Sequence, residues 1–180
     1  PRPALEPLVS PAMTPVALTL PRAVSSTRDR VGESPVWDVA NQCLYWVDIE
    51  GRHIRRLEPA TGLEQSWDLP ERVGCIALAS GGRLLAAMET GVFAVTLHVP
   101  PAVSFTLMAP VSHPAPGMRF NDGRCDRQGR FWVGTVSGLE LLDRASGRFR
   151  HFRHDPFDPN SLSHNEVQSL FEDSRGDIWI

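Results

Sequence analysis

A glycine-containing turn recurs at a fixed interval along this chain, and this recurrence constrains the fold more than any other feature. Gly82, Gly129 and Gly176 each lie in a short turn before an apolar segment, and 47 residues separate each glycine from the next. A second pair of markers, Gly91 and Gly138, has the same separation. Repeats of this length built from short strands are typical of β-propeller blades. The sequence therefore predicts an all-β fold of the β-propeller kind.

The length of the chain limits the number of blades. At 47 residues per repeat, 180 residues hold fewer than four blades, whereas closed propellers have about four to eight. The sequence also stops inside an apolar strand at residues 177–180. We therefore expect a partial propeller of about three to four antiparallel blades. An unpaired strand edge on its open side would favour self-association.

Three segments are expected along the chain. Residues 1–15 are rich in proline and have no hydrophobic pattern, which indicates disorder. Residues 16–136 hold the first blades, and residues 137–180 hold the remaining, truncated blades. Strands are expected at 16–20, at 33–48 (two strands around a turn), and at 53–58, 64–69, 73–78, 83–88, 92–97, 104–110, 120–126, 131–136, 139–143, 149–153, 167–172 and 177–180.

The composition argues against several classes of partner. The net charge is −3 with both signs mixed, and no lysine-rich run suggests contact with nucleic acid. No apolar run approaches the 18 or so residues of a membrane-spanning helix, so no membrane partner is expected. The three cysteines, Cys43, Cys75 and Cys125, form no close pair. An odd, scattered set argues against a disulfide framework and predicts a reducing, cytoplasmic location.

Polar residues before two inner strands form the candidate site. Glu33 precedes the strand that starts the first complete blade, and Arg119, Asn121 and Asp122 precede a later inner strand. We expect Glu33 and Asn121 to approach each other at the inner mouth of adjacent blades, with Arg119 close by. Oxygen donors of these kinds suit a hard cation such as Ca²⁺ or Mg²⁺. Two alternatives stay open: Glu33 as a solvated surface charge, and residues 121–123 as a plain turn.

Four runs of sequence carry a family resemblance. They are Gly-Glu-Ser-Pro-Val-Trp at 32–37, Leu-Tyr-Trp-Val-Asp-Ile at 44–49, Arg-Phe-Asn-Asp-Gly at 119–123 and Asp-Arg-Gln-Gly-Arg-Phe-Trp-Val-Gly-Thr at 126–135. These runs resemble the senescence marker protein, gluconolactonase and luciferin-regenerating enzyme family over about residues 29–136. The resemblance implies a six-bladed propeller with a divalent metal in its channel that opens sugar lactones.

The same resemblance implies roles for individual residues. Glu33 matches a metal ligand, for Ca, Zn, Mn or Mg, and Arg119 and Asn121 match residues that contact the sugar lactone. Asp122 completes the motif as a further substrate-binding residue. The family takes its other ligands and its base from later blades, and nothing after Val136 matches those motifs. No catalytic residue is therefore assigned, and we expect an incomplete or inactive lactone hydrolase.

The last part of the chain resembles a different propeller family. Residues 137–180, with Asn-Ser-Leu-Ser-His-Asn at 160–165, are similar to the two-component regulator propeller repeat. That repeat builds the extracytoplasmic sensor domains of bacterial hybrid histidine kinases. Two propeller families would then meet near residues 132–135, as in a chimera or a joined fragment. The alternative function is thus a ligand-sensing segment of a hybrid sensor kinase.

Overall fold

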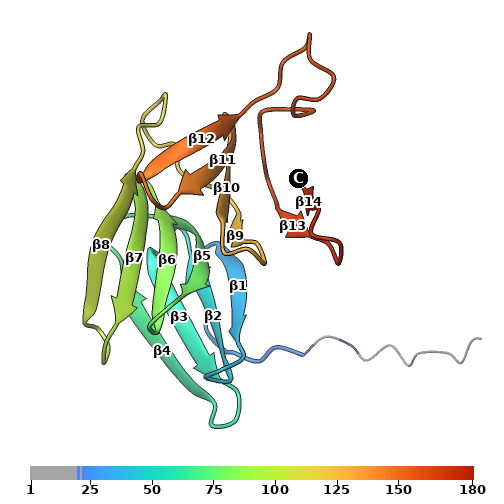
Figure 1. Ribbon diagram of the computed structural model, residues 1–180. Coiled ribbons are helices and arrows are strands. Elements are labelled where there is room, and N and C mark those ends of the chain that lie inside the picture. The colour runs from blue at the N-terminus through green and yellow to red at the C-terminus, as the bar shows by residue number, and fades with distance from the viewer. Residues whose placement is uncertain (1–19, 21) are drawn as a thin grey trace, which may run out of the picture.

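The computed structural model describes residue 20 and residues 22–180, and Figure 1 shows how their strands are arranged. The disorder expected for residues 1–15 and most of the strand expected at 16–20 lie outside this part of the chain. Leu20 itself is not in a strand. Among the described residues there is no helix long and apolar enough to cross a membrane.

The described chain is all-β and is built from successive antiparallel sheets, as the repeat predicts (Figure 1). Three sheets have four strands each, and a two-stranded sheet follows them. The first sheet contains β1 (Gly32–Asp38), β2 (Cys43–Asp48), β3 (His53–Glu58) and β4 (Leu63–Asp68). The second contains β5 (Val73–Ala79), β6 (Arg83–Met88), β7 (Gly91–Leu97) and β8 (Val103–Pro110). The third contains β9 (Gly123–Cys125), β10 (Phe131–Thr135), β11 (Gly138–Asp143) and β12 (Arg148–Phe152). The last sheet is β13 (Phe171–Glu172) with β14 (Ile178–Trp179).

The 47-residue repeat of the sequence is a repeat of the structure. Gly82, Gly129 and Gly176 each lie in the turn that joins the first two strands of a blade, with φ of 70°, 74° and 89°. These angles are in the left-handed region that favours glycine. Gly91 and Gly138 each begin the third strand of a blade. The propeller fold predicted from the glycine spacing is therefore confirmed.

The hydrophobic core lies between consecutive blades. One buried cluster joins Val47 of the first blade to Ile76 of the second, and another joins Val92 of the second to Phe131 of the third. A smaller cluster around Leu139 connects the third blade to the fourth. Strand β1 lies beside β5, and β5 beside β9. Burial of these apolar faces stacks the sheets and lines up their first strands.

Two strands begin three or four residues later than the sequence predicts. The strand expected at 120–126 is reduced to β9, and the one expected at 167–172 is reduced to β13. The carboxylate of Asp122 lies at both strand starts, because it accepts hydrogen bonds from the backbone N–H groups of Gly123 (2.8 Å) and Leu170 (2.8 Å). Leu170 N, just before β13, thus bonds to an aspartate side chain and not to a neighbouring strand. Before β9, two backbone bonds with Gly134 continue the pairing with β10.

Candidate functional site

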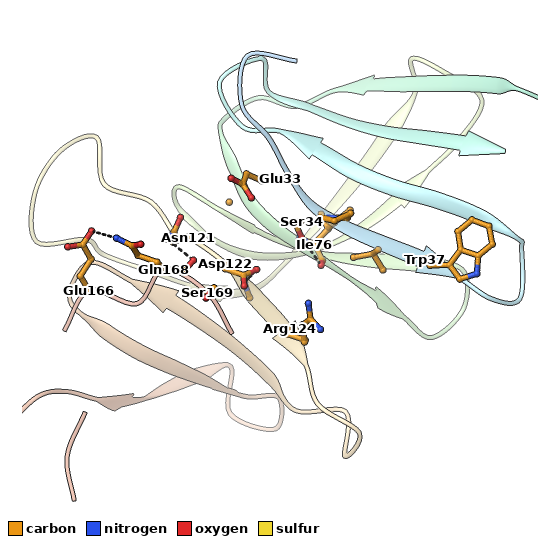
Figure 2. Close-up of a pocket in the computed structure, with 14 residues that line it drawn as sticks. Glu33, Ser34, Trp37, Ile76, Asn121, Asp122, Arg124, Glu166, Gln168 and Ser169 are labelled. Carbon is orange, nitrogen blue, oxygen red and sulfur yellow. Dashed lines mark hydrogen bonds between the residues drawn. The ribbon is translucent and has the colours of Figure 1, made fainter. Parts of the chain in front are cut away.

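A cavity of about 610 Å³ lies where the first strands of the blades begin, and it is lined by residues of four blades, three of which contribute polar side chains. Glu33 contributes from β1, Gly74 from β5, Asn121 from the segment before β9 and Gln168 from the segment before β13. Figure 2 shows Glu33, Asn121, Asp122, Glu166 and Gln168 gathered around it. Gly74, Asn121 and Gln168 are each 47 residues apart. Equivalent positions of consecutive repeats therefore form one wall of the cavity.

An irregularity in β1 places Glu33 at the cavity. The pairing of β1 with β2 shifts register between Glu33 and Val36, and Ser34 has a φ of 51°. The Ser34 hydroxyl holds this conformation, because it accepts a hydrogen bond from Ile76 N (3.0 Å) and donates one to Ile76 O (3.3 Å). Bulges of this type re-aim side chains near functional sites. The exposed Glu33 carboxylate thus lines the cavity and makes no ion pair with the described residues.

Hydrogen bonds on both sides fix the orientation of Asn121. Its amide nitrogen donates to the carbonyl oxygens of Val167 and Gln168, both at 3.2 Å. Its Oδ1 accepts from Arg119 Nη1 at 3.3 Å, and the same Nη1 donates to Phe120 O at 2.8 Å. Arg119 does not line the cavity. The structure therefore places Arg119 behind Asn121, where it orients the amide.

The carboxylate of Asp122 lines the cavity but is occupied by backbone. Its two oxygens accept the hydrogen bonds from Gly123 N and Leu170 N described above, so it joins the third blade to the fourth. Cys75 lies nearby in β5. Burial raises the pKa of its thiol well above its usual range, and the Asp122 carboxylate adds to the effect. Cys75 is therefore a neutral, buried thiol and not a nucleophile.

The blades that carry Glu33 and Asn121 are not adjacent, and this corrects the sequence analysis. Glu33 belongs to the first blade and Asn121 leads into the third, with the start of β5 between them. Gly74 makes this possible, since a Cβ there would lie 2.2 Å from Phe120 O and 2.7 Å from Asn121 O. The absence of a side chain at this position lets the third blade approach, so that both polar residues reach one cavity.

Four polar lining residues were not predicted from the motifs. Glu166, Gln168 and Ser169 lie 47 residues after Arg119, Asn121 and Asp122, so the spacing of the repeat would have found them. The fourth is Arg124, an exposed residue of β9 that lines the cavity. It makes no ion pair with the described residues. The cavity therefore presents both free carboxylate and free guanidinium groups to a ligand.

The donors present fit a resident divalent cation only in part. Glu33 supplies a free carboxylate, whereas Asp122 is engaged with backbone and Glu166 accepts a hydrogen bond from Gln168 (3.3 Å). Within residues 22–180, no group of three or more His, Cys, Asp or Glu residues is arranged to hold a metal ion. Calcium takes about six to eight oxygen ligands. The described residues alone therefore do not form a metal site.

Comparison with protein families gives two matches. Residues 31–168 match the family described as SMP-30/gluconolactonase/LRE-like region, and residues 161–180 match the two component regulator propeller. The two matches share residues 161–168, at the start of the fourth blade. The first match contains every residue discussed at the cavity up to Gln168.

Curated relatives resemble the same part of the chain. A 6-deoxy-6-sulfogluconolactonase from Pseudomonas putida is 39% identical over 118 residues, which cover 66% of this chain and 39% of that protein. Regucalcin from Xenopus laevis is 37% identical over 114 residues, or 63% of this chain and 37% of that protein. The matched part thus spans about two fifths of the length of these relatives.

Solved structures share the fold. A calcium-binding protein, regucalcin from Agrobacterium tumefaciens, superposes with a TM-score of 0.62 at 26% identity, covering 72% of this chain and 45% of that chain. The extracellular domain of a proposed hybrid two component system from B. thetaiotaomicron has a TM-score of 0.61 at 19% identity. The match covers 81% of this chain and 19% of that chain. At that identity the second likeness concerns the fold alone. Both similarities agree with the propeller architecture.

Proposed function

The chain belongs to the SMP-30/gluconolactonase/LRE-like family, and on this basis we propose that its cavity is part of the substrate site of a sugar lactone hydrolase. The observation that carries the proposal is the meeting of Glu33 and Asn121 on one cavity, although 88 residues separate them in the sequence. Curated relatives named as sugar lactonases support the reaction class.

The side chains suit a polyhydroxylated ligand. Asn121 is held rigidly by Arg119 and by the backbone of residues 167–168, so its amide is oriented before a ligand arrives. Groups that are positioned in advance bind and orient a substrate at a lower entropic cost. The free guanidinium of Arg124 favours a substrate that carries a negative charge, because it offers several N–H donors in a plane. A sulfonated or carboxylated sugar lactone therefore fits better than a neutral one.

We assign no reaction step to the residues described. Glu33 would supply one ligand to a divalent cation, with Ca, Zn, Mn and Mg as candidates, and such an ion would polarise the lactone carbonyl. A general base must lie within hydrogen-bond reach of the attacking water. Both oxygens of Asp122 are engaged with backbone, and Glu166 is bonded to Gln168 through one oxygen only, so no base is assigned. We propose that residues 1–180, without an assigned base, bind a lactone without turning it over efficiently.

Binding tests the site directly. We expect a non-hydrolysable sugar lactam to shift NMR signals of residues around the cavity, and Asn121→Ala to weaken its binding about tenfold, which is the effect of losing roughly 1.4 kcal/mol of hydrogen bonding. The matched control is Asn160→Ala, because Asn160 is exposed in the connector after β12. Equal affinity of both variants would contradict the proposed site.

Turnover tests the missing base. With Mn²⁺, Zn²⁺, Ca²⁺ or Mg²⁺ added in turn, we expect residues 1–180 to open a sugar lactone no faster than the same metal in buffer, as followed by proton release. Rapid metal-dependent hydrolysis that Glu33→Gln abolishes would show that a carboxylate of this chain acts as the base.

The second candidate is a ligand-sensing propeller. It is favoured by the match of residues 161–180 to the two component regulator propeller. A sensor would bind its ligand with no dependence on metal, whereas a lactonase site would bind the lactam more tightly when the metal is present. The lactam titration, repeated with and without Ca²⁺, separates the two.

A further inference from the structure

We propose that the cavity between the second and third blades binds a small organic anion, meaning a carboxylate carried on an apolar body. This interblade cavity has a volume of about 380 Å³ and is lined by Leu85 and Ala94 of the second blade and Leu142 of the third, among others. Its volume lies in the range of small-molecule pockets, which is about 300–1,000 Å³.

The interblade cavity is separate from the candidate lactone site. It lies at the end of β5, beside residues 78–80, whereas the lactone site lies at the beginning of β5, beside Gly74. The two cavities share no lining residue, and on β5 the lining of the lactone cavity ends at Ile76 while that of the interblade cavity starts at Leu78. Both walls of the interblade cavity come from complete four-stranded sheets.

Three arginines make this cavity strongly positive. Arg83, Arg127 and Arg144 line it, and none of them forms an ion pair with any described residue. Arg83 donates to Ser80 O (3.2 Å) and Arg127 to Ser174 O (2.9 Å), so two of the guanidinium groups are held by backbone carbonyls. Arg144 has no hydrogen-bond partner among the described residues. An unneutralised set of this kind attracts an anion.

The one carboxylate that lines the cavity does not neutralise these arginines. The Asp126 side chain is 1% exposed and already accepts hydrogen bonds from Arg130 Nε (2.5 Å) and Trp132 Nε1 (2.8 Å). Its other oxygen accepts two backbone N–H groups. The positive charge of the cavity is therefore available to a ligand.

The floor of the cavity defines the rest of the ligand. Leu142 is 3% exposed and Ala94 is 6% exposed, and Leu85 and Met108 add further apolar surface to the lining. An apolar group placed there would leave water, while its carboxylate would meet the planar guanidinium groups. Neither an inorganic anion nor a neutral alcohol satisfies both parts of the cavity.

An NMR titration of the 180-residue protein with three probes tests the proposal. Hexanoate carries the charge and the apolar body, hexan-1-ol only the apolar body, and inorganic phosphate only the charge. We expect hexanoate to bind with a Kd on the order of 1 mM and to shift the signals of Ala94 and Leu142. The other two probes should bind at least about tenfold more weakly, since each lacks one of the two interactions.

Variants identify the groups responsible. Arg144→Gln should weaken hexanoate about tenfold, because it removes a charge-assisted hydrogen bond, and Arg144→Lys should give an intermediate affinity. Arg148→Gln is the matched control, since Arg148 is an exposed arginine of β12 that does not line the cavity. The proposal is overturned if hexanoate does not bind, if either other probe binds equally well, or if Arg144→Gln and Arg148→Gln have the same effect in folded protein.

Discussion

At the scale of single residues, Gly74 shows how closely the inner strands pack. A Cβ at this position would lie 2.2 Å from the carbonyl oxygen of Phe120, which is backbone and cannot rotate away. We expect Gly74→Ala to lower the free energy of unfolding by about 1–3 kcal/mol, as overpacking does, and to displace Asn121. Urea denaturation measures the first effect and lactam binding the second. Gly32→Ala is the control, because the nearest atom to its Cβ is an Asp29 side-chain oxygen at 3.4 Å. An equal loss of stability in both variants would contradict this account.

At the scale of one structural element, Asp126 closes the turn between β9 and β10. Burial alone would raise the pKa of Asp126, but hydrogen bonds from Trp132 and Arg130 hold that pKa below its usual value. The folded state thus binds this proton more weakly than the unfolded state, so the stabilisation is complete above about pH 5 and is lost as the pH falls below about 3.9.

We expect Asp126→Asn to lower the free energy of unfolding by about 1–3 kcal/mol at pH 7, because the amide cannot accept all four N–H groups. The same change should make stability depend less on pH below about pH 5. Asp173→Asn, the same change 47 residues later at a more exposed turn, should have a smaller effect. A curve for Asp126→Asn that keeps the acid slope of the parent protein would refute this role.

At the scale of the whole molecule, the last sheet exposes apolar side chains beside unpaired strand edges. Phe171 is 57% exposed and Ile180 is 54% exposed, on or next to β13 and β14 (Figure 1). Such edges favour association between copies. We expect the 180-residue protein to self-associate in sedimentation experiments as its concentration rises, and Phe171→Lys to reduce this. Phe157→Lys is the control, since Phe157 is 93% exposed but lies in the connector away from the sheet. Equal behaviour of the two variants would show that another surface mediates the association.

The sequence predicted the strands well because glycine turns and apolar segments are local signals. Gly82, Gly129 and Gly176 needed only their own turns to be identified, and most strand ends agree with the structure within one or two residues. The late start of β13 was not foreseen, because Leu170 N bonds to Asp122, which is 48 residues away. A contact of that kind is invisible in a local pattern.

The candidate site was predictable only in part. The motifs indicated Glu33, Asn121 and Asp122, which all line one cavity. They did not indicate that Arg119 would lie outside the cavity lining and donate a hydrogen bond to Asn121. The left-handed backbone of Ser34, which aims Glu33, is stabilised by Ile76 of the next blade. Side-chain direction here depends on contacts between blades, so the functional roles of these residues stay predictions.

The wall of the lactone cavity has a consequence for how such a protein changes over evolutionary time. Gly74, Asn121 and Gln168 occupy the same position in three consecutive repeats, and each projects from a blade that is folded by its own turns and ladder. A mutation of the exposed Gln168 side chain alters its own sector of the cavity, whereas a side chain at Gly74 would also displace Asn121 in the next repeat. New specificities can therefore be acquired at the fourth blade alone, while a change at the second blade must be matched by a change at the third.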